Sequence, residues 1–415
     1  MSRRTLYFIS HWGTGEPLFH ALVVPALEML LARDAVDRVC LYVLDPGKGP
    51  IGRLAEVHGV ELRPMRSVGS PWKPLARALT LFRSCLGMAR DARRERPLVI
   101  LGRGAIAGGF AWFVSRWSRI PFGVDLFEPH AEYMVDCGEW SRTGLLYRSL
   151  RWSMNRQMRD ALRLITVTQR YADHLQAAGV KAVKLSVAPC PVPDERFFHA
   201  RVARSETRKE LGYDQKLVAV YMGKFGGLYH RERAFEAFET ARQVVGERFR
   251  LLVMTGESEN VVKEGLSRVG FPTSLVRVER VPHDAIPARL GACDLAFGLY
   301  RGTPSSMGIS PMKIAEYWSS GLPVLLTRGV GDDSGIIEKE PYGGAVFDPE
   351  GNDLKVAMEK VLRTLAEPDQ VMRTQELARK YRSMEHTFKA LKGLLTAAED
   401  AHGPVPSAEE GPQRG

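Results

Sequence analysis

Short apolar runs alternate with helical stretches in both halves of the chain, and this order constrains the fold more than any other feature. In the first half the apolar runs cover residues 5–10, 39–44, 98–101, 122–126 and 164–168. In the second half they cover residues 217–222, 249–255, 276–281, 295–299 and 323–327. Strands that alternate with helices predict parallel sheets covered on both faces. The sequence therefore predicts an α/β protein with one such sheet in each half.

A proline-rich segment divides the two halves. Pro189, Pro191 and Pro193 cannot continue a helix or pair in the middle of a sheet, and they predict a linker. Two doubly wound, Rossmann-like domains in tandem predict a ligand site in the cleft between them, because open α/β sheets bind ligands beyond the carboxyl ends of their strands. We predict a first domain over residues 1–192, a second over 193–368, helices over 369–400 that pack back toward the first domain, and a disordered tail over 401–415.

The positive charge of the chain is concentrated in its first half. Lysine and arginine total 58 against 48 acidic residues, a net charge of +10, and residues 1–196 carry 28 of the basic and 18 of the acidic side chains. This excess favours an anionic partner, which is either nucleic acid, an anionic lipid surface or a phosphorylated acceptor. No apolar run approaches the roughly 18 residues that span a bilayer, and we expect a cytoplasmic protein.

Two basic helical stretches account for much of this charge. Each repeats apolar residues among arginines, namely Leu75, Leu79, Phe82 and Leu86 in one stretch and Leu146, Leu150 and Met154 in the other. Two arrangements are open: the apolar stripes pack on the sheet, or the helices lie on an anionic membrane surface at the inner face of the cell membrane. We favour packing, with membrane contact as an added property.

The strongest local pattern begins at Gly308, Ile309 and Ser310, which lead into a predicted helix. The free N–H groups and positive dipole end of such a helix suit a phosphate. Lys313 adds a positive charge, and Glu316 shares its helix face, where a carboxylate can accept two hydrogen bonds from a ribose diol. The alternative is a solvent-exposed helical pair of these two side chains.

A second pattern follows the apolar run over residues 217–222. Gly223 allows the backbone to approach an anion closely, and Lys224 can neutralise a diphosphate as it leaves. Arg231 is the nearest arginine that can assist. A glycine-rich loop with a surface lysine also occurs for structural reasons alone.

In the first half, candidate side chains follow three predicted strands. Gly13 and Gly15 follow the first, and Arg103 follows the run over residues 98–101. Glu128 and His130 flank Pro129 after the run over residues 122–126. Arg103 suits an acidic acceptor, and Glu128 is a second acceptor-binding candidate. A lone histidine such as His130 is more often a satisfied hydrogen-bonding residue, which is the alternative to a functional role.

Residues 310–324 resemble the C-terminal motif of glycosyltransferase family 4 and its relatives of GT-B fold. In that family, as here, a Pro and a Lys precede Glu-Tyr or Glu-Ala, a Gly and Pro-Val. The resemblance implies that Glu316 contacts the ribose of a nucleotide-sugar donor and that His130 contacts the transferred sugar. Many members have another Glu eight positions before the motif's Glu, and here that position is Gly308.

The resemblance implies a hexosyltransferase-like enzyme in which residues 1–192 bind the acceptor and residues 193–368 bind the donor. Such an enzyme moves a sugar from a nucleotide-diphosphate sugar to an acceptor hydroxyl, with retained configuration and without a metal or other cofactor. The implied setting is the synthesis of a bacterial surface polysaccharide or glycolipid. The catalytic candidates are His130, Lys224 and Glu316; the donor-binding candidates are Gly13, Gly15, Gly223, Arg231, Gly308, Ile309, Ser310 and Lys313.

Three alternatives stay open. The first is a nucleotide-sugar epimerase of the same architecture. The second is a sugar-nucleotide-binding protein without activity, which Gly308 favours. The third is a nucleic-acid-binding protein, although no RNA-binding or DNA-binding module is recognisable in the sequence.

Overall fold

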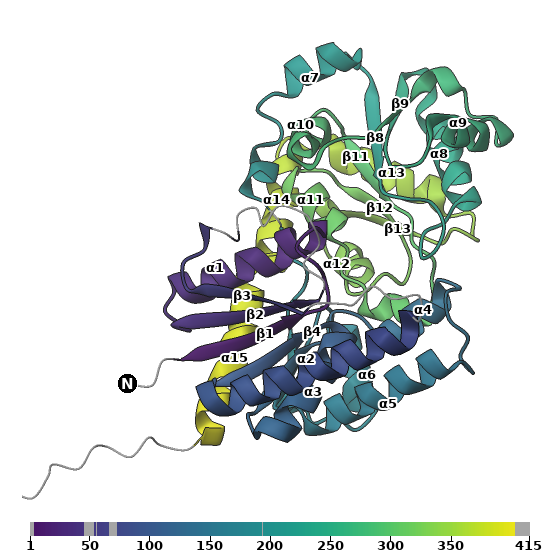
Figure 1. The fold of residues 1–415 in the computed structure, drawn as a ribbon. Coiled ribbons are helices and arrows are strands. Elements are labelled where there is room, and N and C mark those ends of the chain that lie inside the picture. Colours follow the sequence, from purple (N-terminus) through teal and green to yellow (C-terminus); the bar gives the residue numbers. More distant parts are fainter. Residues whose placement is uncertain (1–3, 45–53, 55, 66–72, 193, 403–415) are drawn as a thin grey trace, which may run out of the picture.

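The computed structural model describes residues 4–44, 54, 56–65, 73–192 and 194–402. The chain forms two lobes, each built around a parallel sheet (Figure 1). The predicted linker residue Pro193 lies outside the described residues, as does the predicted tail apart from Ala401 and His402, which end the last helix.

The first sheet has seven strands in the order β3-β2-β1-β4-β5-β6-β7, and all neighbouring pairs are parallel. The strands are β1 (Thr5–Ser10), β2 (Arg38–Leu44), β3 (Val60–Met65), β4 (Val99–Arg103), β5 (Phe122–Asp125), β6 (Arg163–Thr166) and β7 (Leu185–Val187). The helices between them are a π-helical turn η1 (Phe19–Val23), α1 (Val24–Ala32), α2 (Lys73–Glu95), α3 (Gly104–Ser118), α4 (His130–Asp136), α5 (Leu145–Asp160), α6 (Gln169–Ala177) and η3 (Ala182–Lys184).

The second sheet has six parallel strands in the order β10-β9-β8-β11-β12-β13. The strands are β8 (Leu217–Met222), β9 (Phe249–Met254), β10 (Val276–Glu279), β11 (Leu295–Gly298), β12 (Val324–Thr327) and β13 (Gly344–Phe347). The α-helices are α7 (Arg204–Leu211), α8 (Glu232–Val245), α9 (Glu259–Arg268), α10 (Ile286–Gly291), α11 (Met312–Ser319), α12 (Asp333–Lys339) and α13 (Leu354–Leu365). Shorter 3-10 turns are η4 (Glu195–His199), η5 (Gly246–Arg248), η6 (Thr273–Leu275), η7 (His283–Ala285), η8 (Pro304–Gly308) and η9 (Pro341–Gly343).

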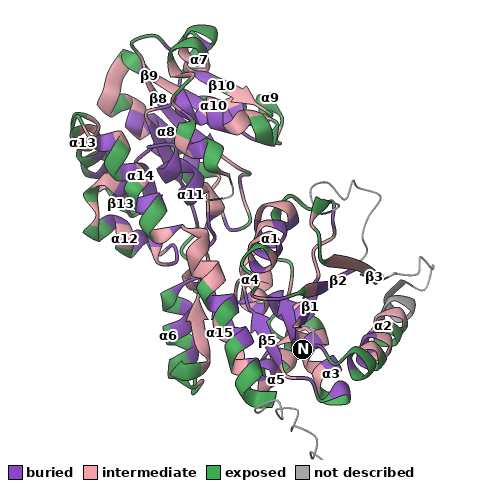
Figure 2. Cartoon of the chain, turned by 90° about the vertical axis from the view of Figure 1, so that its left-hand side faces the viewer, coloured by how far each residue is buried: buried purple, intermediate pink, exposed green. Residues whose placement is uncertain are grey.

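Both sheets are buried between layers of helices, as the apolar runs predict. Figure 2 shows the central strands as buried and the outer helix faces as exposed. Each sheet has an apolar cluster on either side, and the side chains of β1 and β8 alternate between the two clusters of their sheet. A buried parallel sheet of this kind brings the carboxyl ends of its strands to one edge, where loops carry the functional side chains.

The chain returns to the first lobe at its end. α14 (Gln370–Tyr381) packs on α11 in the second lobe, whereas α15 (Met384–His402) lies along the first sheet and contributes Leu391 and Leu394 to its core (Figure 1). The prediction that residues 369–400 pack back toward the first domain therefore needs a correction for α14. Within the described residues, no helix is both long and apolar enough to cross a membrane.

The predicted inward-facing stripe of α2 also needs a correction. Cys85, Met88, Ala89 and Ala92 face the core, whereas Leu79 and Phe82 are about half exposed at 49% and 48%. Leu75 belongs to the part of α2 whose side chains lie outside the described residues. In α5, Met154 is buried but Leu146 is 63% exposed. These helices thus leave some of their large apolar side chains outside, although others, such as Leu81 and Leu150, pack against the core.

Candidate functional site

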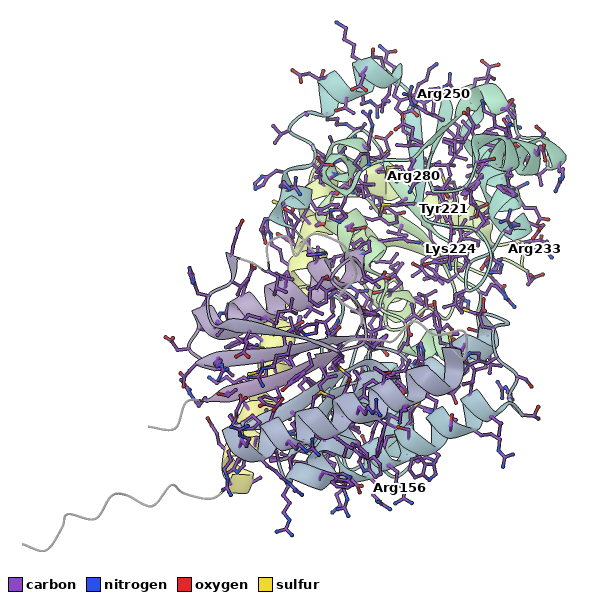
Figure 3. All side chains as sticks on the ribbon, viewed as in Figure 1. Arg156, Tyr221, Lys224, Arg233, Arg250 and Arg280 are labelled. Atoms are coloured by element: carbon purple, nitrogen blue, oxygen red, sulfur yellow. The ribbon has the colours of Figure 1, made fainter. Side chains whose placement is uncertain are left out.

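A glycine-rich loop follows β8 at the edge of the second sheet that faces the first lobe. Gly223, Gly226 and Gly227 all have positive φ, a backbone conformation that favours glycine. The loop is fixed to the end of β11, because Arg301 N–H donates to the Leu228 carbonyl (2.7 Å) and the Arg301 guanidinium donates to the Gly227 carbonyl (2.9 Å). The exposed Lys224 projects from this loop (Figure 3).

Lys313 reaches the same loop from the first turn of α11. Its ammonium lies 4.0 Å from the ring centre of Tyr229 and 5.8 Å from that of Tyr300. A Cβ added to Gly223 would collide with Lys313 Nζ, so glycine at this position makes room for the ammonium. Lys313 has no hydrogen-bond or ion-pair partner among the residues that the structure describes.

Glu316 lies three residues further along α11 and is only 5% exposed. Burial raises the pKa of its carboxyl to about 7, although the positive charge of Lys313 acts to lower it. No hydrogen bond to this carboxylate is present within the described part of the chain. The predicted solvent-exposed pair of Lys313 and Glu316 is therefore not what forms: the carboxyl group is buried and the ammonium rests on aromatic rings.

Arg231 is brought to the loop by a carboxylate. Glu257, which follows β9, accepts hydrogen bonds from the Arg231 guanidinium (3.0 Å) and from Phe225 N–H (2.8 Å). Arg231 Nε lies 4.0 Å from the place of a Cβ at Gly226. Glu257 therefore holds the positive charge of Arg231 beside the glycine loop.

The first lobe contributes a strained turn between β5 and α4. Phe127 has φ of +58°, which is uncommon for a residue with a large side chain, and strain of this kind often accompanies functional sites. The turn places Glu128 and His130 side by side, so that His130 Nδ1–H donates to Glu128 Oε1 at 2.7 Å. Glu128 thereby orients the imidazole, and the second ring nitrogen of His130 has no hydrogen-bond partner among the described residues.

Aromatic side chains that the sequence did not single out surround His130. Its ring centre lies 6.3 Å from that of His11, 6.1 Å from Tyr133 and 6.1 Å from Trp140. His11 Nδ1–H donates to the Arg103 carbonyl (3.0 Å), and burial lowers the pKa of His11. His11 belongs to the loop after β1, so this loop reaches the surroundings of His130. The donor-binding roles of Gly13 and Gly15 stay predictions.

The two sets of side chains face each other across the domain boundary, where α4 packs on η8. The Asp136 carboxylate accepts a hydrogen bond from Ser305 N–H (2.8 Å). Gly308 packs so tightly on Pro129 that any side chain at position 308 would collide with it. The glutamate that the family places at this position therefore has no room here, and this contact explains the glycine.

Arg103 has a role different from the acceptor binding that the sequence suggested. It is 7% exposed and forms a buried ion pair with Asp125, its direct neighbour in the register of β4 and β5. Its guanidinium also lies 5.1 Å from the ring centre of Trp12 and 5.4 Å from that of Phe127. The charge of Arg103 is therefore committed to holding the loops after β1 and β5.

Ser310 lies where the two lobes join, and the neighbouring Ile309 packs against an apolar cluster of the second lobe. Ser310 Oγ accepts hydrogen bonds from Cys190 N–H (3.0 Å) in the linker and from Arg382 at the junction of α14 and α15. Arg382 in turn pairs with Asp333, and both side chains are buried. Burial raises the pKa of Asp333 to about 6. The predicted donor-binding hydroxyl of Ser310 is thus engaged where the chain crosses twice between the lobes.

Asp332 of the second lobe makes a further contact with the first lobe. Its carboxylate accepts hydrogen bonds from Gln169 N–H (2.6 Å) and Arg170 N–H (3.1 Å) at the start of α6. A negative charge at a helix N-terminus is stabilising. No cluster of three or more histidine, cysteine and acidic side chains suited to a metal ion occurs within the described ranges. Catalysis without a metal stays a prediction.

Comparisons with known proteins agree on the architecture. Sucrose-phosphate synthase from Thermosynechococcus elongatus matches with a TM-score of 0.69 at 16% identity, over 97% of this chain and 100% of that chain. HepE from Anabaena in complex with UDP matches with a TM-score of 0.67 at 17% identity, over 96% and 100%. The protein has the GT-B fold. This confirms the predicted fold and the resemblance to GT-B glycosyltransferases.

Two further matches concern the first lobe and the whole chain, respectively. Residues 26–191 match the model of the glycosyl transferase 4-like domain, which covers most of the first lobe. A putative UDP-N-acetylglucosamine 2-epimerase from Listeria monocytogenes matches the structure with a TM-score of 0.61 at 13% identity, over 96% of this chain and 97% of that chain. No curated protein sequence matches the chain.

Proposed function

We propose that this GT-B protein is a glycosyltransferase that moves a sugar from a nucleotide-diphosphate sugar to an acceptor hydroxyl. The observation that carries the proposal is the arrangement on α11, where the Lys313 ammonium and the buried Glu316 carboxyl both lack a described hydrogen-bond partner beside the glycine loop. An ammonium and close-lying backbone suit a diphosphate, and a carboxyl suits a ribose diol.

The chemistry depends on negative charge that develops on the diphosphate as the bond between sugar and phosphate breaks. Lys224 and Lys313 stabilise this charge, and Arg231 adds to the positive field of the loop. His130, oriented by Glu128, contacts the transferred sugar from the first lobe. Retained configuration follows from the resemblance to family 4, and a bacterial surface polysaccharide or glycolipid is the product class that we propose.

Substitution of the proposed site tests this function. HepE was crystallised with UDP and with UDP-glucose, so UDP-glucose is the first donor to try in a thermal-shift screen of UDP-, GDP- and dTDP-sugars. We expect Lys224→Ala and Glu316→Ala each to lower turnover at least tenfold, since removal of one such group costs about 10²- to 10³-fold. Lys263→Ala, on the outer helix α9, serves as the control. Near-normal turnover in both site variants would reject the assignment.

Epimerisation is the second candidate, and the fold shared with the putative Listeria epimerase favours testing it. An epimerase converts the donor when no acceptor is present, whereas a glycosyltransferase needs the acceptor. Incubation with donor alone, followed by product analysis, separates the two reactions. Donor binding by calorimetry without turnover on any acceptor would instead indicate a protein that binds sugar nucleotides without activity.

We further propose that the first lobe contacts an anionic membrane surface through α2, α3 and α5, which pack side by side. Among the described side chains of these helices, six large apolar ones are exposed: Leu79, Phe82, Trp117, Leu145, Leu146 and Trp152. The Arg156 guanidinium lies 5.2 Å from a ring centre of Trp152, and Figure 3 shows Arg156 on the side of this lobe that faces away from the second lobe. Apolar side chains among arginines are typical of helices that lie in a membrane interface.

Vesicle sedimentation tests the membrane proposal. We expect the protein to sediment with vesicles that contain phosphatidylglycerol and to remain in the supernatant with phosphatidylcholine alone. Trp152→Ser combined with Leu146→Ser is expected to reduce this binding, whereas Met372→Ser, an equally exposed change on the second lobe, is not. Equal binding of both variants would contradict the proposal.

A further inference from the structure

Two tyrosines and a glycine determine where the Lys313 ammonium lies. Tyr229 and Tyr300 form an isolated antiparallel bridge, and their ring centres are 4.9 Å apart. Tyr229 N–H donates to the Gly226 carbonyl (3.1 Å), and Tyr300 N–H donates to Thr327 Oγ1 (2.9 Å). Because both backbones are pinned, the two rings form a fixed surface for a cation.

The ammonium rests on this surface although a carboxyl group lies on the same helix face. A lysine and a glutamate three residues apart on a helix ordinarily pair with each other. Here the Lys313 Nζ atom lies 4.0 Å from the Tyr229 ring centre, and no ion pair with Glu316 forms. A cation over an aromatic face is attracted by the ring quadrupole. For the Lys313 ammonium this attraction replaces part of the attraction that an ion pair with Glu316 would provide. Lys313 and Glu316 therefore both remain available to a ligand.

Gly223 is the third residue that limits where the Lys313 ammonium can lie. A Cβ at this position would collide with Lys313 Nζ, and the next atoms that it would meet are also those of the Lys313 side chain. The ammonium is thus held between the tyrosine rings and the backbone at the end of β8. This is the place where, on the proposed function, the diphosphate of the donor lies.

We propose that Tyr229, together with Tyr300 and Gly223, is a positioning residue that holds the Lys313 ammonium for the diphosphate and keeps it from pairing with Glu316. The inference rests on the proposed function for the identity of the ligand. The positioning itself does not depend on glycosyl transfer, and it can be tested separately.

Pyrophosphate binding tests the inference with a matched set of variants. Inorganic pyrophosphate serves as the probe in calorimetry, because it represents the donor without its base or sugar. We expect Lys313→Ala, Tyr229→Leu and Gly223→Ala each to weaken binding at least tenfold. Tyr229→Phe keeps the ring and is expected to bind within twofold of the unmodified protein. Gly246→Ala is also expected to bind within twofold of the unmodified protein, because Gly246 has positive φ and an open Cβ position but lies at the end of α8, outside the loop.

A second measurement needs no ligand. When Tyr229→Leu removes the ring, the ammonium is free to approach Glu316, and the pKa of the Glu316 carboxyl falls from its raised value of about 7. The pKa is measured by NMR on protein with ¹³C-labelled glutamate, with Glu316→Gln to assign the signal. Tyr229→Phe is expected to leave the pKa unchanged.

The outcomes separate the inference from the proposed function. If Lys313→Ala loses pyrophosphate binding but Tyr229→Leu binds normally and leaves the Glu316 pKa unchanged, the positioning role is overturned and the donor site stands. If Tyr229→Phe is as defective as Tyr229→Leu, the ring is not what matters and the inference also fails. If Lys313→Ala binds pyrophosphate normally, the proposed donor site itself is wrong.

Discussion

The two lobes differ in whether the charged side chains at the edges where they meet are paired. In the first lobe, Arg103 and Asp125 stand opposite each other at the ends of β4 and β5 and form a buried ion pair. In the second lobe, Lys313 and Glu316 share a helix face but remain apart, and no described side chain pairs with either. A charge that is already neutralised supports the fold, whereas a charge left without a partner is available to a ligand.

Removal of Arg103 is expected to have the largest effect on the free energy of unfolding. Arg103→Met leaves Asp125 buried without its partner, and the loss of one member of a buried pair costs about 3 to 5 kcal/mol of unfolding free energy. Lys313→Met breaks no pair, so we expect its cost to stay below about 1 kcal/mol. Urea denaturation measures both. The double variant Arg103→Met with Asp125→Leu should recover most of the loss, and equal costs for Arg103→Met and Lys313→Met would refute the distinction.

The pH dependence of the unfolding free energy tests whether Glu316 is buried without a partner. Its pKa is about 7 in the folded protein against 4.5 for an ordinary glutamate, because burial disfavours the charged form. The folded state thus binds the proton more tightly. The stabilisation that comes from protonated Glu316 is complete below pH 4.5 and is lost as the pH rises to about 7. This change in unfolding free energy is on the order of 3 kcal/mol.

Glu316→Gln removes this titration. The unfolding free energy of the unmodified protein, relative to that of Glu316→Gln, should therefore fall between pH 4.5 and 7 and then level off. Denaturation curves at several pH values measure the difference. A constant difference across this range would show that Glu316 is not a buried, unpaired carboxyl in solution.

The smallest predicted effect concerns the contact that joins the two lobes. Gly308→Ala places a Cβ against Pro129, and overpacking of this kind costs about 1 to 3 kcal/mol. Gly335→Ala within α12 is the control, because its Cβ meets nothing within 4 Å and alanine favours a helix. Thermal unfolding compares the two variants. If Gly308→Ala is as stable as Gly335→Ala, the lobes do not meet at Pro129 as described.

The sequence predicted the sheet layout well because most strands are continuous apolar runs. It missed β3, β7 and β13, each of which lies at the edge of its sheet. In β3, Glu61, Arg63 and Pro64 interrupt the apolar pattern. β3 is an edge strand, where proline is tolerated, and its charges are satisfied by pairs between Arg63, Glu61 and Glu95. Such pairs depend on tertiary contacts, which strand patterns do not contain.

The candidate site was predictable where motif residues are close in sequence, as Lys313 and Glu316 are. The ring of Tyr229, the carboxylate of Glu257 and the imidazole of His11 come from separate loops, and only the fold brings them to their partners. The pairing of Arg103 with Asp125 required the register of β4 and β5. The sequence therefore singled out charged side chains as candidates but did not indicate which of them were already neutralised.

A crystal structure with UDP-glucose, or with the donor that a thermal-shift screen identifies, would show whether the donor binds at α11 and the glycine loop. We predict that the diphosphate lies between the loop of Gly223 and Lys224 and the Lys313 ammonium, with the ribose at Glu316. A nucleotide found elsewhere, for example in the cavity of about 520 Å³ beside Arg328 and Lys360 on the second lobe, would contradict the account.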